Sequence, residues 1–190
     1  MKTIRYLLIA LFIVTNCNFV LAPVMKIDKK MITEQIILHQ KEVKYYELYT
    51  QSLDKLKSFE GLRLMPYFDS KGMTIGYGHA MRSYEHFTSI TNEKAEALLR
   101  VDFEGAMQSV ERATGYNRLD NPEKVLALAH FVFNFGEDAF NRSTMLKNIR
   151  AEKPIDNEIR RWVHADIHGE KVVLSCLKER REYELKLYYS

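Results

Sequence analysis

A run of residues that is apolar on nearly every side, Val125–Phe133, constrains the fold more than any other feature of the chain. A helix that is hydrophobic all round is buried inside a domain. Asn121 and Pro122 precede the run, and a side-chain cap followed by proline is a typical helix start. Gly136 follows the run and predicts its end. The sequence therefore predicts a central buried helix that the side chain of Asn121 caps.

A stretch of different texture lies earlier in the chain. Leu64–Phe68 and Met73–Tyr77 are short and rich in aromatic or β-branched residues, and Asp69–Gly72 lies between them. Asp bonds readily to nearby backbone and Gly accepts a positive φ, so the connecting segment has the composition of a turn. The pattern predicts a small antiparallel hairpin.

Helices are predicted on both sides of these two features, so we expect an α+β fold that is mostly helical. It has two lobes, a small hairpin lobe near the amino end and a helical lobe around the central helix. Apolar residues at steps of three and four predict the further helices. They are one or two helices over 28–59, a helix capped by Thr91, a short helix capped by Ser143 or Thr144 and closed by Pro154, a helix around 159–163 that carries Trp162, and a last helix over about 174–188.

Composition excludes several classes of protein. Hydrophobic residues make up 46% of the chain, which rules out a disordered chain. The net charge of +3 falls to +1, 26 basic against 25 acidic side chains, without Lys2 and Arg5. No basic run stands out, so nucleic acid is not expected as a partner. Two cysteines cannot form a disulfide scaffold, and Cys176 is expected to be a small buried thiol.

Residues 1–22 are interpreted as an export signal or signal anchor. A positive start is followed by the apolar run Tyr6–Val14, which is too short for a spanning helix. Cleavage after Ala22, lipid attachment at Cys17 and retention as an uncleaved anchor all stay open. Residues 23–56 are then a helical stalk or an extra packed helix, and 57–190 form the main domain. We expect a periplasmic or extracellular protein, with a membrane tether through its amino end as one alternative.

The sharpest chemical constellation is Glu60, Asp69 and Thr74. A carboxylate ends the leading helix, a second opens the hairpin turn, and a hydroxyl lies on the return strand. Glycoside hydrolysis needs a protonated carboxyl for the leaving oxygen and an ionised carboxylate that activates water or attacks. The two groups need different environments, and here one lies beside Phe59 and the other in a polar turn.

The wording around these residues carries a resemblance. Glu60–Asp69 followed by Gly72–His79 resembles the active-site signature of phage-type lysozymes, the endolysins of glycoside hydrolase family 24. The similarity continues in register over about residues 57–188. The other similar segments are Thr91–Asp102, Phe133–Gly136, Phe140–Leu146, Arg161–Trp162 and Arg180–Arg181.

The resemblance implies a role for each matching position. Glu60 matches the general acid, Asp69 the partner carboxylate, and Thr74 the hydroxyl that helps to hold the attacking water. The substrate is then peptidoglycan, cut at the β-1,4 bond between N-acetylmuramic acid and N-acetylglucosamine by a monomer without a cofactor. The positions that match the glycan-binding wall are Phe133, Asn134, Ser143 and Thr144. Arg180 and Arg181 match a pair of which one faces the cleft, and the other is expected on a solvated helix face.

One departure affects the hairpin. Only Met73 separates Gly72 from Thr74, where many members of the family have two residues. A change of one residue moves side chains to the other face of a strand unless the turn absorbs it. The separation of the carboxylates, which distinguishes inversion from retention, therefore stays open, and the family resemblance favours inversion.

Three alternatives remain. His164 and His168 have a spacing that would suit a metal on a helix, but Gly169 ends such a helix and the resembled family needs no metal. A lytic transglycosylase would use Glu60 alone and let a sugar hydroxyl attack. A non-catalytic wall-binding protein of the same fold would have no need for both carboxylates.

Overall fold

The computed structural model describes residues 29–69, 72–167 and 169–190. The export segment 1–22 with Cys17, and also His168, lie outside these residues. The chain divides into two compact units, Met1–Ile37 and Leu38–Ser190. Within the described ranges, no helix is both long enough and apolar enough to span a membrane.

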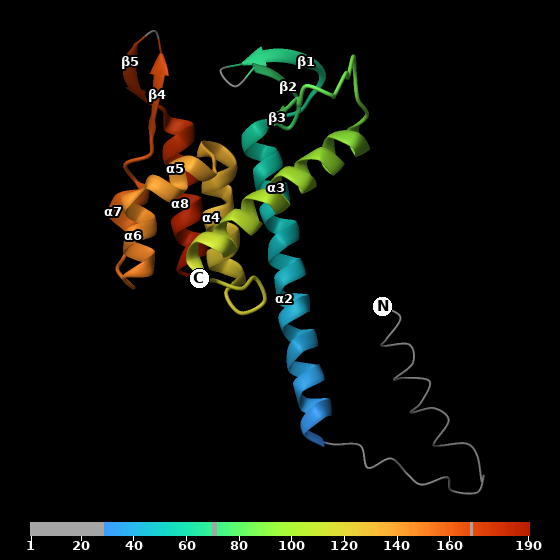
Figure 1. Ribbon diagram of the computed structural model, residues 1–190, viewed down its shortest axis with the longest axis vertical. Coiled ribbons are helices and arrows are strands. Elements are labelled where there is room, and N and C mark those ends of the chain that lie inside the picture. Colours follow the sequence, from blue (N-terminus) through green and yellow to red (C-terminus); the bar gives the residue numbers. More distant parts are fainter. Residues whose placement is uncertain (1–28, 70–71, 168) are drawn as a thin grey trace, which may run out of the picture. The chain divides into compact units, whose positions relative to one another are not determined.

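The described chain is mostly helical, with two small antiparallel sheets (Figure 1). The elements are α2 (Lys29–Glu60), β1 (Arg63–Asp69), β2 (Gly72–Gly76), β3 (His79–Ala80), α3 (Asn92–Thr114), α4 (Pro122–Phe135), α5 (Glu137–Arg142), α6 (Thr144–Arg150), α7 (Asp156–Ile159), β4 (His164–Ile167), β5 (Glu170–Val173) and α8 (Ser175–Tyr188).

The predicted central helix is confirmed as α4. Every residue from Val125 to Val132 is buried, and α4 packs against both α3 and α8. The helix has proline at its first turn and ends at Gly136. The predicted cap is wrong, because the Asn121 side chain makes no cap bond. Its φ of −134° and ψ of 52° lie outside the extended region that a side-chain cap needs.

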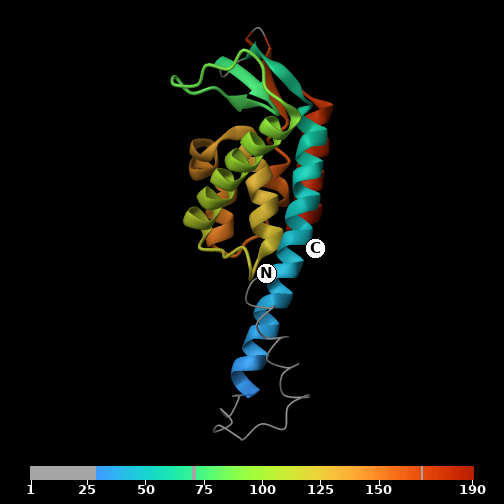
Figure 2. The same cartoon turned by 90° about the vertical axis from the view of Figure 1, so that its right-hand side faces the viewer.

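The predicted hairpin is also confirmed, and β3 extends it to a three-stranded sheet. In the register of β1 and β2, Asp69 lies opposite Gly72 and Tyr67 opposite Thr74. Both views place this sheet at the end of α2 where that helix stops (Figure 1 and Figure 2). We call β1, β2 and β3 the hairpin lobe.

The segment between α6 and α8 differs from the prediction. The helix expected around 159–163 is the short α7, which ends at Ile159, and Trp162 follows it. His164 lies in β4 rather than on a helix, and β4 pairs with β5 as a second hairpin. Cys176 is exposed, not buried, because the first turn of α8 turns the next residue, Leu177, inward instead.

The part of α2 that belongs to the second unit packs along the helical lobe. Leu53 and Leu56 are members of the hydrophobic core, together with residues of α3, α4, α6 and α8. Farther from the hairpin lobe, Lys41 pairs with Asp120 at 2.5 Å. Helix α2 therefore forms part of the core before it delivers its last residue to the hairpin lobe.

Candidate active site

Glu60 is the last residue of α2, and the break after it points its side chain toward two other elements. Gly61 takes a φ of +67°, which ends the helix. Oε1 of Glu60 accepts a 2.6 Å hydrogen bond from Nη1 of Arg180 on α8. A Cβ at Gly78, just before β3, would lie 3.4 Å from Oε2 of Glu60, so glycine leaves room for the carboxylate there.

The ion pair between Glu60 and Arg180 is largely shielded from water. The side chain of Glu60 is 19% exposed and that of Arg180 is 6% exposed. The Arg180 guanidinium also lies 5.0 Å from the ring centroid of Phe59, so it rests on the aromatic residue next to the carboxylate. Arg180 thus fixes one oxygen of Glu60, and the other faces the hairpin lobe.

Asp69 and Thr74 lie on the same face of the hairpin lobe. Residues directly opposite in an antiparallel pair point the same way, as do residues two apart on one strand. Thr74 lies opposite Tyr67, two residues before Asp69, so the register puts the carboxylate and the hydroxyl diagonally across one face. With only Met73 between Gly72 and Thr74, this register still keeps the two side chains on a common side of the sheet.

The two members of this diagonal differ in exposure. Asp69 is exposed at the end of β1, whereas Thr74 is fully buried. The Thr74 hydroxyl lies 3.4 Å from the carbonyl oxygen of Gly72, a long and weak hydrogen bond.

The arginine pair of α8 differs from the expectation, because both side chains are buried and neither lies on a solvated face. Arg181 donates to Glu184 Oε1 at 2.5 Å. Burial raises the pKa of Glu184 to about 7, although Arg181 opposes this shift. Burial also lowers the pKa of Arg181. Arg180 thus binds the carboxylate of Glu60, whereas Arg181, the next residue of α8, binds a carboxylate in the interior.

The four residues that match the glycan-binding wall lie in different settings. Phe133 and Asn134 are half-buried on α4, and Asn134 Oδ1 accepts a hydrogen bond from Arg181. Ser143 is buried and caps α6, accepting from the amide of Leu146 at 3.0 Å. Thr144 is exposed.

Ser143 and Thr144 also line a cavity of about 480 Å³ beside the second hairpin. We call it the hairpin cavity, after the hairpin of β4 and β5 and not the hairpin lobe. Phe135 and Trp162 give it aromatic walls. Its remaining lining is mostly charged and consists of Arg142, Glu158, Arg161, His164, Lys171 and Ala165.

Two histidines differ in their surroundings. His130 on α4 is fully buried between the rings of Phe103 and Tyr183, and burial lowers its pKa to about 3, so it packs as a neutral ring. His79 on β3 is held by two carboxylates, with Nδ1 2.7 Å from Asp102 and Nε2 2.9 Å from Glu85. Sequence reasoning missed this second arrangement, because the partners of His79 lie on α3 and in the loop before it.

Comparisons with known proteins agree with this architecture. Residues 57–184 match the model of a protein family described as phage lysozyme. The chain is 33% identical over 138 residues to an endolysin of Acyrthosiphon pisum secondary endosymbiont phage 1, an alignment that covers 71% of this chain and 92% of that relative. It is 32% identical over 152 residues to the SAR-endolysin of Escherichia phage Mu, covering 76% of this chain and 80% of that one.

Solved structures extend the comparison. The muramidase domain of SpmX from Asticaccaulis excentricus superposes with a TM-score of 0.65 at 30% identity, covering 74% of this chain and 95% of that domain. An endolysin from Escherichia coli O157:H7 phage FAHEc1 superposes with a TM-score of 0.60 at 31% identity, covering 72% and 89%. The family model covers most of the chain, from the last turn of α2 into α8, and the chain therefore belongs to the phage lysozyme family, whose enzymes are glycosidases that hydrolyse peptidoglycan.

Proposed function

We propose that the chain is an endo-acting muramidase that hydrolyses the β-1,4 bond between N-acetylmuramic acid and N-acetylglucosamine with two carboxylates. Glu60 protonates the glycosidic oxygen. Asp69 activates the attacking water, and the hydroxyl of Thr74 helps to hold that water. The observation that carries the proposal is the position of Glu60, whose Oε1 is held by Arg180 while its Oε2 faces the hairpin lobe.

The division of labour follows from the two environments. Glu60 is mostly shielded and Asp69 is exposed, so one carboxyl lies in a site that water hardly reaches and the other beside solvent. A general acid and a general base need such a difference. Attack by water on the face of the sugar opposite the leaving group inverts the anomeric centre.

The glycan contacts follow the family match. We propose that Phe133, Asn134, Ser143 and Thr144 contribute to the wall along which the glycan lies. Ser143 and Thr144 border the hairpin cavity, which supports a contact between this wall and the substrate. Of the two arginines, Arg180 is the one beside Glu60, and we assign it to the active site.

The chemistry of the cut ends tests this proposal. Purified peptidoglycan is digested by the full chain, by Asp69→Asn and by Glu60→Gln, and the fragments are identified by mass spectrometry. The proposal predicts reducing muramic ends from the parent and almost none from either variant. Anhydro ends that survive Asp69→Asn would mean transglycosylase chemistry, and a folded parent that binds the wall without cutting it would be a binding protein.

We also propose that residues 1–22 direct export and that the amino-terminal segment tethers a monomeric enzyme to the membrane beside its substrate. Every member of the hydrophobic core that the structure describes lies in the compact unit Leu38–Ser190, so this role would take no residue from that core. Fractionation of cells that express the full chain, or a chain that begins at Leu38, tests the tether. The full chain is expected with the membranes and the shortened one in the soluble fraction, whereas two soluble chains would contradict it.

A further inference from the structure

A charged side chain lies in the interior at the point where three segments meet. Arg181 is fully buried and is among the largest side chains of the core. Its Nη2 donates to Glu184 Oε1 at 2.5 Å and to Asn134 Oδ1 on α4 at 3.3 Å. Its Nη1 donates to the carbonyl oxygen of Trp162 at 3.2 Å. One guanidinium therefore joins α8, the end of α4 and the segment that leads into β4.

Aromatic contacts reinforce this junction. The Arg181 guanidinium lies 5.1 Å from the ring centroid of Phe131 and 4.9 Å from that of Phe135. The ring of Trp162 packs edge-on against the same two rings, at 5.1 and 5.0 Å. Phe135 and Trp162 are the aromatic walls of the hairpin cavity. The side chain of Arg181 thus contacts both aromatic walls of the cavity, the ring of Phe135 and the backbone of Trp162.

The energetics of such a pair favour a geometric role. Desolvation of a buried ion pair offsets most of its Coulomb attraction, and apolar replacement of both partners is often neutral for stability. The planar guanidinium fork, in contrast, fixes the directions of the groups it binds in a way that no apolar side chain reproduces. The junction therefore contributes less to stability than to the relative placement of its three segments.

We propose that Arg181 is a positioning residue of the enzyme. It fixes the position of Trp162, in the wall of the hairpin cavity, relative to Glu60. The connection runs along α8, because Arg180, the preceding residue, holds Glu60. This inference rests on the proposed function, since it assumes that the substrate touches both the carboxylate and the cavity wall.

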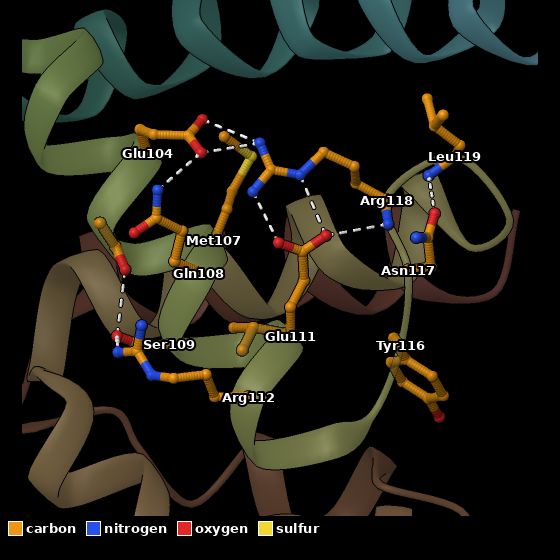
Figure 3. Close-up of polar contacts among 12 residues, drawn as sticks. Glu104, Met107, Gln108, Ser109, Glu111, Arg112, Tyr116, Asn117, Arg118 and Leu119 are labelled. Carbon is orange, nitrogen blue, oxygen red and sulfur yellow. Dashed lines mark hydrogen bonds and ion pairs between the residues drawn. The ribbon is translucent and has the colours of Figure 1, made fainter.

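The test replaces both partners of the buried pair by apolar residues, in Arg181→Met/Glu184→Leu. The control is Arg118→Met/Glu111→Leu. Arg118, in the loop after α3, is also bound by two glutamates, and both of them lie on α3 (Figure 3). Its guanidinium lies 6.0 Å from the ring centroid of Tyr45, about four turns of α2 before Glu60. Trp162 is the only tryptophan of the chain, so intrinsic fluorescence reports directly on the cavity wall.

The proposal predicts at least a tenfold fall in kcat/KM on peptidoglycan for the Arg181 double variant, measured well below its melting temperature. Its Trp162 emission is expected to shift or to split into several lifetimes. The control is expected to keep both readouts even where its melting temperature falls. A folded Arg181 double variant with parental kcat, KM and emission would overturn the proposal.

If the Arg181 double variant fails to fold, Arg181→Lys keeps the charge and removes the fork, and parental rate and emission in that variant would overturn the proposal. If the parent itself does not cut peptidoglycan, the proposed function fails. Trp162 emission in the folded variants then decides separately whether Arg181 sets the cavity wall.

Discussion

Glu60, the proposed general acid, shows how single residues hold a carboxylate in place at the end of a helix. The carboxylate would be free to rotate in water, but Arg180 binds Oε1 and Gly78 leaves space beside Oε2. The sequence predicted Glu60, Asp69 and Thr74 as catalytic residues, and these roles stay a prediction. It did not predict that both arginines of α8 are buried, because a pair of adjacent charges on a helix normally includes one solvated side chain.

The Thr74 hydroxyl gives a prediction at this scale. Thr74→Val keeps the shape and strand preference of a buried residue and removes only the hydroxyl. Its hydrogen bond to Gly72 is long, so the free energy of unfolding is expected to change by less than about 1 kcal/mol. Loss of the group that helps to hold the water is expected to lower the initial rate of peptidoglycan solubilisation about 100-fold.

The control for this change is Thr114→Val at the end of α3, whose hydroxyl donates to the carbonyl oxygen of Val110 and accepts from the amide of Tyr116. Its rate is expected to equal that of the parent in the same turbidity assay. A Thr74→Val enzyme with the parental rate would remove the hydroxyl from the mechanism.

At the scale of elements, long and periodic segments were predictable and short ones were not. Helices α3 and α8 were predicted from apolar residues that recur over several turns, and α4 from its continuous apolar run. The hairpin of β4 and β5 was missed, since all residues of β5 are exposed and leave no alternation to detect. Helix α5 and strand β3 are too short to show a period.

The attachment of β3 to α3 gives a prediction on pH. Carboxylates only accept hydrogen bonds, so His79 donates to both Asp102 and Glu85 only when its ring is protonated. The bond to Asp102, and then that to Glu85, raise the pKa of His79 above its ordinary 6.5. This stability is fully present below the unfolded pKa of 6.5 and is lost as the pH rises through the higher folded pKa.

Denaturant titrations of the parent and of His79→Gln measure this effect. The difference in unfolding free energy between them is expected to be larger at pH 5.5 than above the folded pKa. The backbone amide of Arg82 and then the His79 ring lower the pKa of Glu85 from 4.5, so this part of the stability is lost only when the pH falls through that lower value. A difference independent of pH between 5.5 and 10 would contradict the ion-pair description.

The loop between α3 and α4 gives a third prediction. Arg118 binds Glu104 at 2.8 Å and Glu111 at 2.6 Å, and its own backbone amide also donates to Glu111 (Figure 3). Glu111→Gln weakens several charge-assisted bonds in a partly shielded site, and is expected to cost about 1–3 kcal/mol. Glu182→Gln, in the exposed pair with Arg160, is expected to cost below about 1 kcal/mol. Equal losses in thermal unfolding would contradict this ranking.

At the scale of the whole molecule, the catalytic unit extends beyond the family match. The match begins at residue 57, but the compact unit begins at Leu38, and Leu53 and Leu56 belong to its core. The sequence left two interpretations of this segment open, a stalk and a packed helix, because its apolar residues recur at steps of three and four with Lys and Glu between them. A periodic pattern predicts a helix, but it does not show which part of that helix packs against the rest of the domain.

Truncation measures how much this segment matters. A chain of residues 57–190 lacks two buried leucines, and losses of about 2–5 kcal/mol for each are comparable with the total stability of a domain. It is expected to lack a cooperative thermal transition, whereas a chain beginning at Leu38 is expected to unfold like the full chain. Cooperative unfolding of the 57–190 chain at the parental temperature would show that α2 is dispensable.

The rate at which Glu60→Gln releases new reducing ends from purified peptidoglycan most directly tests the proposal that Glu60 is the general acid. Glutamine keeps the shape and the hydrogen-bonding oxygen of Glu60, but its amide cannot transfer a proton to the glycosidic oxygen. The variant is expected to fold with a lowered melting temperature, because the shielded Arg180 loses its charged partner. Measured well below that temperature, its rate is expected to lie about 100-fold or more below that of the parent, the scale of lost general acid catalysis. A folded Glu60→Gln protein that cuts at the parental rate would show that this carboxyl is not the acid.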